Sequence, residues 1–277
     1  MELGFSSLGH VFNSIRSNKF HNLFEILLEG TKASLEFGEK NKIGVCEVVL
    51  EPPEIFSREN QNRFIDMCNS YSIKKQVHGP LIDVQMCSYN DLISNATMES
   101  YLESAKICDK INSDILVIHP GSGFGGRFFR TVGTEKLINS MKNLLKIVAQ
   151  LCPNVKICIE NMPRRAHFFN YIEEINQFFD EVNRDDIFMT WDTSHSWTCD
   201  INLEDFWEKF HKIIKNIHLA DNDNKESDTH PELGSAKVDF REIIDIIKKY
   251  NYRDNLIVEL SSTQGLLSSF EFIKKLL

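Results

Sequence analysis

The chain contains 277 residues, and its hydrophobic content of 42% and charged content of 26% are ordinary for a globular protein and exclude a disordered or fibrous one. Its net charge of −9 argues against a whole-surface electrostatic grip on nucleic acid, although a carboxylate-rich site for cations would account for part of that charge. At this length the chain could form two small domains or one (β/α)8 barrel, since barrels of about 250 residues are common.

Apolar runs and helical periodicity along the chain predict eight units, each a short strand followed by a helix. The strands are expected at residues 3–8, 43–50, 73–78, 115–119, 155–160, 187–192, 213–218 and 256–259. The helices are expected at residues 20–39, 59–69, 98–111, 135–151, 171–182, 203–210, 240–250 and 270–277. No change in composition marks a linker, so we predict an α/β protein that forms a single-domain (β/α)8 TIM barrel over residues 1–277.

The seven cysteines form no C-x-x-C pair, and several lie within apolar runs, as buried thiols do. We interpret them as reduced, which is typical of a cytoplasmic protein. The first residues lack the pattern of a secretory leader, and no run of about 18 apolar residues predicts a membrane helix. We therefore expect a cytoplasmic protein without a membrane partner, and nothing in the sequence predicts its oligomeric state.

Six of the apolar runs end in a histidine or an acidic residue, namely His78, His119, Glu160, Asp192, His218 and Glu259. In a barrel, the C-terminal ends of all eight strands face one mouth, so these side chains could converge there. The alternative architecture, a doubly wound open sheet, gathers its site at one switch point and fits six separate polar ends less well.

Two loops add further candidates, because His195 follows Asp192 in Trp-Asp-Thr-Ser-His, and Asp228 and His230 belong to Asp-Thr-His. Five imidazoles and four carboxylates suit Zn²⁺ or Mn²⁺. One ion needs about four such ligands, so nine could hold two or three ions with a shared carboxylate. His78 could instead be a buried imidazole that is satisfied by backbone. Four further histidines (His10, His21, His167 and His211) are interpreted as surface or packing residues, and three acidic residues (Asp221, Asp223 and Glu232) as loop-capping or solvated ones.

Four arginines, Arg127, Arg130, Arg164 and Arg165, follow the fourth and fifth predicted strands. Arginine beside the mouth of a barrel favours a substrate that carries phosphate. The alternative is that these residues are ordinary surface arginines.

Taken together, the motifs resemble the xylose isomerase-like TIM-barrel superfamily, which includes endonuclease IV and the sugar-phosphate isomerases and epimerases. The resemblance is carried by the segments His78-Gly-Pro, Val117-Ile-His-Pro-Gly-Ser, Ile159-Glu-Asn, Asp192-Thr-Ser-His, Ile217-His-Leu, Asp228-Thr-His-Pro-Glu-Leu-Gly and Val258-Glu-Leu. Their order and spacing cover nearly the whole chain.

The nine candidates match the three-zinc ligand set of endonuclease IV, a DNA-repair hydrolase that cleaves DNA next to an abasic site. By this resemblance Glu160 is the bridging carboxylate, with His78, His119 and Glu259 on its metals. Asp192 and His218 complete that inner site. His195, Asp228 and His230 then serve the third ion.

The sequence also departs from endonuclease IV, because Leu81 follows Gly79-Pro80 where that enzyme has an aromatic residue that helps to enter the DNA. A competing resemblance implies a sugar or sugar-phosphate isomerase or epimerase with one Mn²⁺, Co²⁺ or Mg²⁺ bound by Glu160, Asp192, His218 and Glu259. In that enzyme the two glutamates are the catalytic groups and transfer a proton through an enediolate. A third class is a metal-bound barrel without turnover.

The complete ligand set favours an endonuclease IV-like phosphodiester hydrolase with two or three zinc ions over the isomerase. The expected substrate is phosphorylated or sugar-like, and abasic DNA is one candidate.

Overall fold

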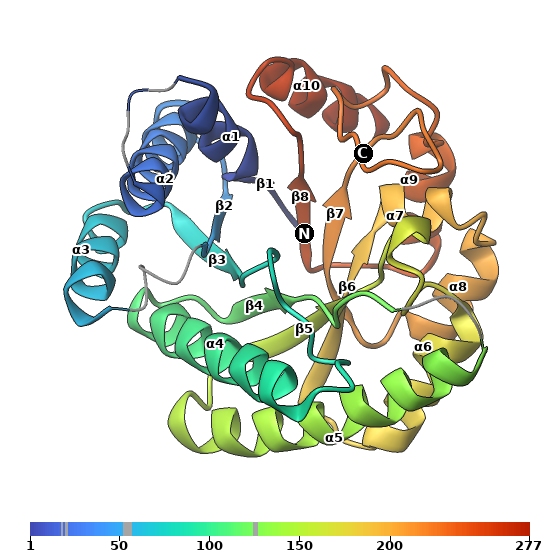
Figure 1. The fold of residues 1–277 in the computed structure, drawn as a ribbon. Helices are drawn as coiled ribbons and strands as arrows, with labels where there is room; N and C mark the ends of the chain where they lie inside the picture. Colours follow the sequence, from blue (N-terminus) through green and yellow to red (C-terminus); the bar gives the residue numbers. More distant parts are fainter. Residues whose placement is uncertain (18, 20–21, 52–56, 124–126) are drawn as a thin grey trace.

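The computed structural model describes residues 1–17, 19, 22–51, 57–123 and 127–277, and its centre is a closed barrel of parallel strands (Figure 1). The strands follow one another around the barrel in chain order, and the first pairs with the last. The predicted (β/α)8 TIM barrel is therefore confirmed.

The strands are short, and each predicted strand is found to within a residue or two. Their bounds are Glu2–Ser6 (β1), Val45–Val49 (β2), Lys74–His78 (β3), Ile115–Ile118 (β4), Lys156–Glu160 (β5), Ile187–Asp192 (β6), Ile214–Leu219 (β7) and Asn255–Val258 (β8). Strands that are covered by helices on the outside and by packed side chains on the inside must be apolar almost throughout. This requirement explains why runs of apolar residues located most of the strands, whereas β3 (Lys-Lys-Gln-Val-His) and β7 (Ile-Lys-Asn-Ile-His-Leu) also carry polar residues.

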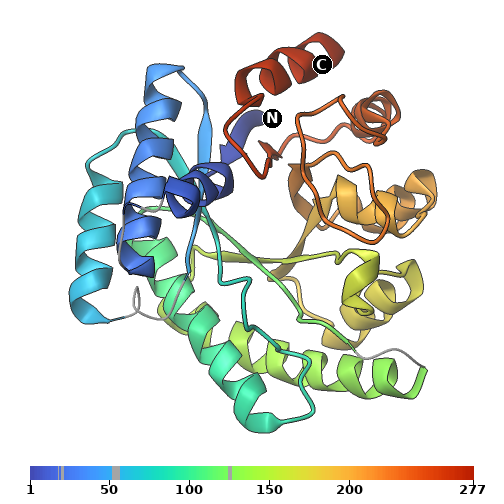
Figure 2. The same ribbon diagram turned by 45° about the horizontal axis from the view of Figure 1, so that its top comes forward.

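The helices form a ring outside the strands, which Figures 1 and 2 show from two directions. Their bounds are Leu8–Ser17 (α1), Leu23–Lys40 (α2), Arg58–Asn69 (α3), Asp91–Lys110 (α4), Arg127–Leu151 (α5), Ile172–Val182 (α6), Thr193–Thr198 (α7), Leu203–Phe210 (α8), Phe240–Lys249 (α9) and Leu266–Leu276 (α10). No helix within the described ranges is long and apolar enough to cross a membrane.

Several helix predictions need correction. Helices α1 and α7 were not predicted, and α4, α5 and α10 begin earlier in the chain than predicted. Helix α4 begins after Asn90, whose side chain accepts a hydrogen bond from the backbone N–H of Leu92 at 3.0 Å. Helix α7 begins after Asp192, whose carboxylate accepts from the N–H of His195 at 2.7 Å. Both side chains satisfy N–H groups that the first turn of a helix leaves free.

Polar side chains also occupy the interior of the barrel below its mouth. Glu47 on β2 and Gln76 on β3 are paired in register, and their side chains lie 2.5 Å apart at Oε2 and Nε2. Gln76 also donates to Asn216 on β7 at 3.0 Å and accepts from Asn255 on β8 at 2.8 Å. Apart from Oε1 of Glu47, which has no hydrogen-bond partner, these buried groups are bonded to one another, so the floor beneath the mouth is a hydrogen-bonded layer.

Candidate metal centre

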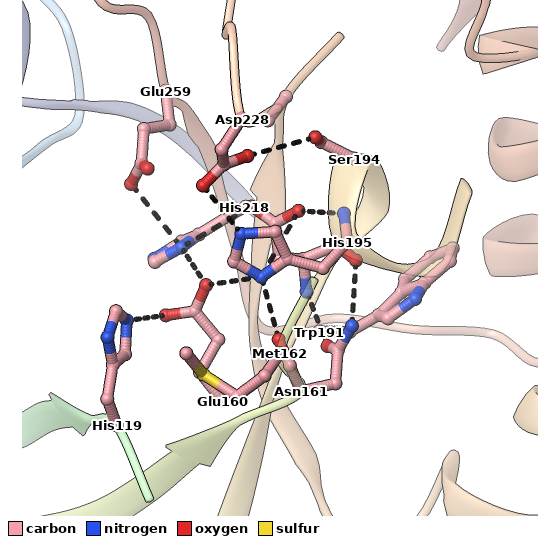
Figure 3. Close-up of polar contacts among 12 residues, drawn as sticks. His119, Glu160, Asn161, Met162, Trp191, Ser194, His195, His218, Asp228 and Glu259 are labelled. Carbon is pink, nitrogen blue, oxygen red and sulfur yellow. Dashed lines mark hydrogen bonds and ion pairs between the residues drawn. The ribbon is translucent and has the colours of Figure 1, made fainter. Parts of the chain in front are cut away.

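The nine predicted ligands converge at the C-terminal mouth of the barrel, as Figure 3 shows for six of them. His78, Glu160 and Asp192 are the last residues of β3, β5 and β6. His119 and Glu259 directly follow β4 and β8, and His218 lies in β7. The remaining three come from segments after the strands: His195 from α7, and Asp228 and His230 from the loop after β7.

Glu160 lies at the centre of this cluster and is almost fully buried. Its Oε2 atom is 3.2 Å from Nε2 of His119 and 3.4 Å from Nε2 of His78. Its Oε1 atom instead faces His218, at 3.4 Å from Nδ1. The two oxygens of one carboxylate thus face different histidines, which is the arrangement that a bridging ligand requires.

Glu259 and Asp228 continue the cluster on the other side of His218. Glu259 has Oε2 at 3.4 Å from Nδ1 of His218 and Oε1 at 3.1 Å from Nδ1 of His230. Asp228 has Oδ1 at 2.8 Å from Nε2 of His230 and Oδ2 at 3.1 Å from Nε2 of His195. Asp228 therefore links the two histidines that the resemblance assigns to a third ion, while Glu259 groups with His218 and His230 rather than with His78 and His119.

Three of the histidines have one ring nitrogen fixed by a partner outside the cluster. Nδ1 of His78 donates to the carbonyl of Gly79, and Nδ1 of His195 donates to the carbonyl of Asn161, both at 2.7 Å. In His218 it is Nε2 that is held, at 3.2 Å from Oε2 of Glu47. Fixing one nitrogen sets the tautomer and the ring orientation, and metal-binding histidines are usually held in this way.

Glu47 and Asn161 were not predicted as site residues, although each holds one of the predicted ligands. Glu47 is the only charged residue within the buried strand Val45–Val49. A lone carboxylate in such an apolar run is a sequence signal that could have indicated a functional residue. Asn161 directly follows Glu160, and its Oδ1 accepts from the N–H of Asp192 at 2.8 Å. That contact joins β5 to the start of α7, and no pattern in the sequence indicates it.

Burial and opposing charges shift the protonation of the cluster. Burial alone lowers the pKa of His78, but the hydrogen bond to Glu160 and the charge of Glu47 outweigh it and raise this pKa to about 9. For His195, burial is likewise outweighed by Asp192 and Asp228, and the pKa rises to about 10. Burial raises the pKa of Asp192 to about 6. Without a metal, the site therefore compensates its carboxylates with protons on its imidazoles.

The chemistry of the donor set fits divalent metal ions. Four sets of three residues each bring one ligand atom of every member within 4.8 Å of the others: His78, His119 and Glu160; Glu160, Asp192 and His218; Asp192, His195 and His230; and Glu47, His218 and Glu259. Among the described residues of the site, Oδ2 of Asp192 is buried and accepts no hydrogen bond. A buried polar atom without a hydrogen bond costs about 1–3 kcal/mol, and a cation beside it would remove that cost.

The four predicted arginines are distributed unevenly around the site. Arg130 donates to Asn170 and Glu174 at 3.2 and 3.1 Å, and Arg164 is bound to Thr198 and Asp200, so both guanidinium groups are already paired. Arg165 lines the cavity over the cluster, 3.6 Å from Oδ2 of Asp228. Arg127 begins α5, and its side chain lies outside the described part of the chain.

The loop that carries Asp228 and His230 is held by Asp221. The Asp221 carboxylate is fully buried and accepts from four backbone N–H groups at 2.8–3.0 Å, those of Asn222, Gly234, Ala236 and Val238. Asp221 therefore caps the loop, which is one of the two roles predicted for it.

The cavity over the nine candidate ligands has a volume of about 460 Å³.

Sequence comparison assigns the family. The model of the xylose isomerase-like TIM-barrel family matches residues 46–276, and the chain belongs to that family. An uncharacterized protein of Methanocaldococcus jannaschii is 24% identical over 91% of this chain and 86% of its own. A probable endonuclease 4 of Mycoplasma mycoides is 27% identical over 74% of this chain and 76% of its own.

Solved structures with the same fold include an epimerase-like protein and a protein with bound zinc. A D-tagatose 3-epimerase-like protein has a TM-score of 0.80 at 22% identity and covers 100% of this chain and 97% of its own. The IolI protein with a bound zinc atom has a TM-score of 0.76 at 18% identity and covers 100% of this chain and 96% of its own. At these identities the structural likeness shows the fold alone. The proteins similar to this one include both a probable endonuclease and an epimerase-like protein.

Proposed function

We propose that this protein is a metal-dependent phosphodiester hydrolase of the endonuclease IV type, with two or three zinc ions. The observation that carries the proposal is the convergence of all nine candidate ligands, including the contacts of Asp228 with His195 and His230. A single-metal isomerase needs four ligands and has no use for Asp228 between His195 and His230. The likeness to a probable endonuclease 4 also supports the proposal.

In this proposal the ligands divide into three groups around shared carboxylates. His78 and His119 bind one ion with Glu160, and Asp192, His218 and Glu259 bind a second with the other oxygen of Glu160. His195, Asp228 and His230 bind the third. When bound, divalent ions in such a site supply hydroxide near neutral pH and offset the negative charge of phosphate oxygens.

The protein itself holds and encloses the substrate. Arg165 is exposed enough to reach a ligand in the cavity. Its guanidinium group would donate two parallel hydrogen bonds to two oxygens of a phosphate. Leu8, Phe12 and Met162 line the same cavity and would exclude water from the ester. Glu47, Gly79 and Asn161 hold three histidines in fixed tautomers, so the ligands need little rearrangement.

The second candidate is a sugar or sugar-phosphate isomerase or epimerase, and one specific feature favours it. Oε1 of Glu160 and Oε2 of Glu259 both lie 3.4 Å from Nδ1 of His218. Two carboxylates that face one point could remove a proton from one carbon of a sugar and return it at the next. A cavity of about 460 Å³ has room for one monosaccharide.

The zinc-loaded protein should be assayed against a duplex with one abasic site, against bis(p-nitrophenyl) phosphate, and against ketohexoses. We expect hydrolysis of at least one phosphodiester, with loss of activity on chelation and recovery on addition of zinc. Interconversion of ketohexoses without phosphodiester cleavage would reject the hydrolase and support the second candidate.

A further inference from the structure

A second, apolar cavity of about 620 Å³ lies beside the candidate metal centre. It is enclosed by α1, α2, the segment after β3 and the first turns of α4, and Figure 2 shows the dark-blue α1 lying against the longer blue α2. Its lining includes large aliphatic side chains that remain open to solvent. Ile82 is 62% exposed and Leu92 is 79% exposed. Exposed apolar side chains gathered around one cavity are typical of a binding site.

The apolar cavity and the metal-site cavity share one wall. Leu8, Phe12, Val49 and Leu81 line both of them. All four residues belong to the ends of strands or to the segments that follow them, so both cavities open on the C-terminal mouth of the barrel. A molecule bound at the metal centre can therefore extend over this wall without leaving the protein surface.

Glu51 fixes the shape of that wall. Its Oε1 atom accepts a hydrogen bond from the N–H of Leu81 and a second from the N–H of Ile82, at 2.8 Å. The carboxylate thus fixes the backbone of this segment, in which Leu81 lines both cavities and Ile82 lines the apolar one. Since this segment is tethered before any ligand arrives, little ordering entropy opposes binding there.

The described residues that line the apolar cavity offer no cationic partner to a polyanion. Within the described residues that line it, the charged ones are Glu51 and Asp83, and none is lysine or arginine. A nucleic acid strand that left the metal centre in this direction would meet aliphatic and acidic groups without a phosphate contact. An uncharged aliphatic chain would bury the same surface favourably.

We propose that the substrate is amphipathic: a phosphodiester head binds at the metal centre, and an aliphatic chain attached to it binds in the apolar cavity. This inference rests on the proposed function and names its substrate class. It selects an alkyl or acyl phosphodiester over abasic DNA, because the cavity beside the centre matches a hydrocarbon and not a phosphate backbone.

The test is calorimetric binding of inorganic phosphate and of methyl, butyl and octyl phosphate to the zinc-loaded protein, below the micelle concentration of each ligand. Burying a methylene is expected to tighten binding about fourfold, so octyl phosphate should bind at least about 100-fold more tightly than methyl phosphate. Leu92→Asp and Ile82→Asp should remove most of that gain and leave methyl phosphate unchanged. Leu267→Asp is the matched control, since Leu267 is an exposed leucine on α10, away from both cavities.

Equal affinity for methyl and octyl phosphate would overturn the inference and leave the hydrolase intact. Failure of every phosphate, including the inorganic ion, to bind would instead count against the proposed function. A wild-type dimer that Leu92→Asp converts to a monomer would also overturn the inference, because a second copy of the chain would then occupy the cavity.

Discussion

Oε2 of Glu47 lies 3.2 Å from Nε2 of His218, and this contact joins the polar floor of the barrel to the candidate metal centre. The same oxygen accepts from Gln76 at 2.5 Å. Because Nε2 is held by Glu47, Nδ1 of His218 faces Glu160 and Glu259. A buried carboxylate behind a ligating histidine raises its basicity and fixes its orientation, so Glu47 should influence metal binding without being one of the nine predicted ligands.

Replacing this carboxylate should weaken the metal site. We expect Glu47→Gln to lower zinc affinity about 10- to 100-fold, since the amide retains a hydrogen bond but loses the charge. Competition with a chromophoric chelator measures the change. Glu99→Gln, at an exposed position on α4, serves as the control. Unchanged zinc affinity in a folded Glu47→Gln protein would contradict this role.

Removing His195 or His230 separates the two candidate functions. In the proposed hydrolase, His195→Ala and His230→Ala should each lower the zinc content by about one ion and reduce phosphodiester cleavage by at least about 100-fold. An isomerase that uses Glu160, Asp192, His218 and Glu259 would keep its activity. His211→Ala is the control, because His211 contacts Trp207 at the end of α8 and lies outside the cluster.

Zinc binding should depend on pH in a defined direction. In the metal-free protein the raised pKa values of His78 and His195, about 9 and about 10, keep both imidazoles protonated at neutral pH. Zinc binds the neutral ring, so it must displace those protons. Apparent affinity should therefore rise about tenfold per pH unit for each proton displaced and level off near those pKa values. Calorimetry in buffers of different ionisation enthalpy counts the protons, and a flat profile would contradict the assignment.

Asp221 should stabilise the loop that supplies two ligands. Asp221→Ala leaves four backbone N–H groups without their acceptor, and we expect it to lower the free energy of unfolding by at least about 1–3 kcal/mol, the cost of a single unsatisfied group. Urea denaturation of the metal-free protein measures the loss. Asp223→Ala, at an exposed position in the same loop, should change stability far less. Equal stability of the two variants would show that the capping contacts contribute nothing.

The strands and the polar residues that converge at their ends could be predicted because one physical requirement governs both. Each strand is buried on two sides, so an apolar run marks it, and a polar residue at its C-terminal end stands out. The end of β6 at Asp192 and the end of β5 at Glu160 were located in this way. Glu47 was not predicted because it lies inside its strand and not at the end. A carboxylate is tolerated there only when partners from β3 and β7 surround it.

The starts of helices and the pairings of side chains were harder to predict from the sequence. Helix α5 begins at Arg127 and passes through Phe128, Phe129 and Gly133, whose weak helix propensity argues for a later start. In the folded chain this turn contacts Tyr89, whose hydroxyl donates to the carbonyl of Phe129 at 2.8 Å and whose ring lies against the Phe129 ring. Arg130 and Arg164 were predicted beside the site, but Glu174 and Asp200, which pair with them, come from segments that only the folded chain brings near.

The central claim is that this centre binds more than one metal ion. Elemental analysis of protein purified without chelators or added metal tests it most directly. We predict about two to three zinc ions per chain, bound by the three proposed ligand groups around Glu160 and Asp228. One exchangeable manganese, cobalt or magnesium ion per chain, or no metal after careful reconstitution with zinc, would contradict the claim.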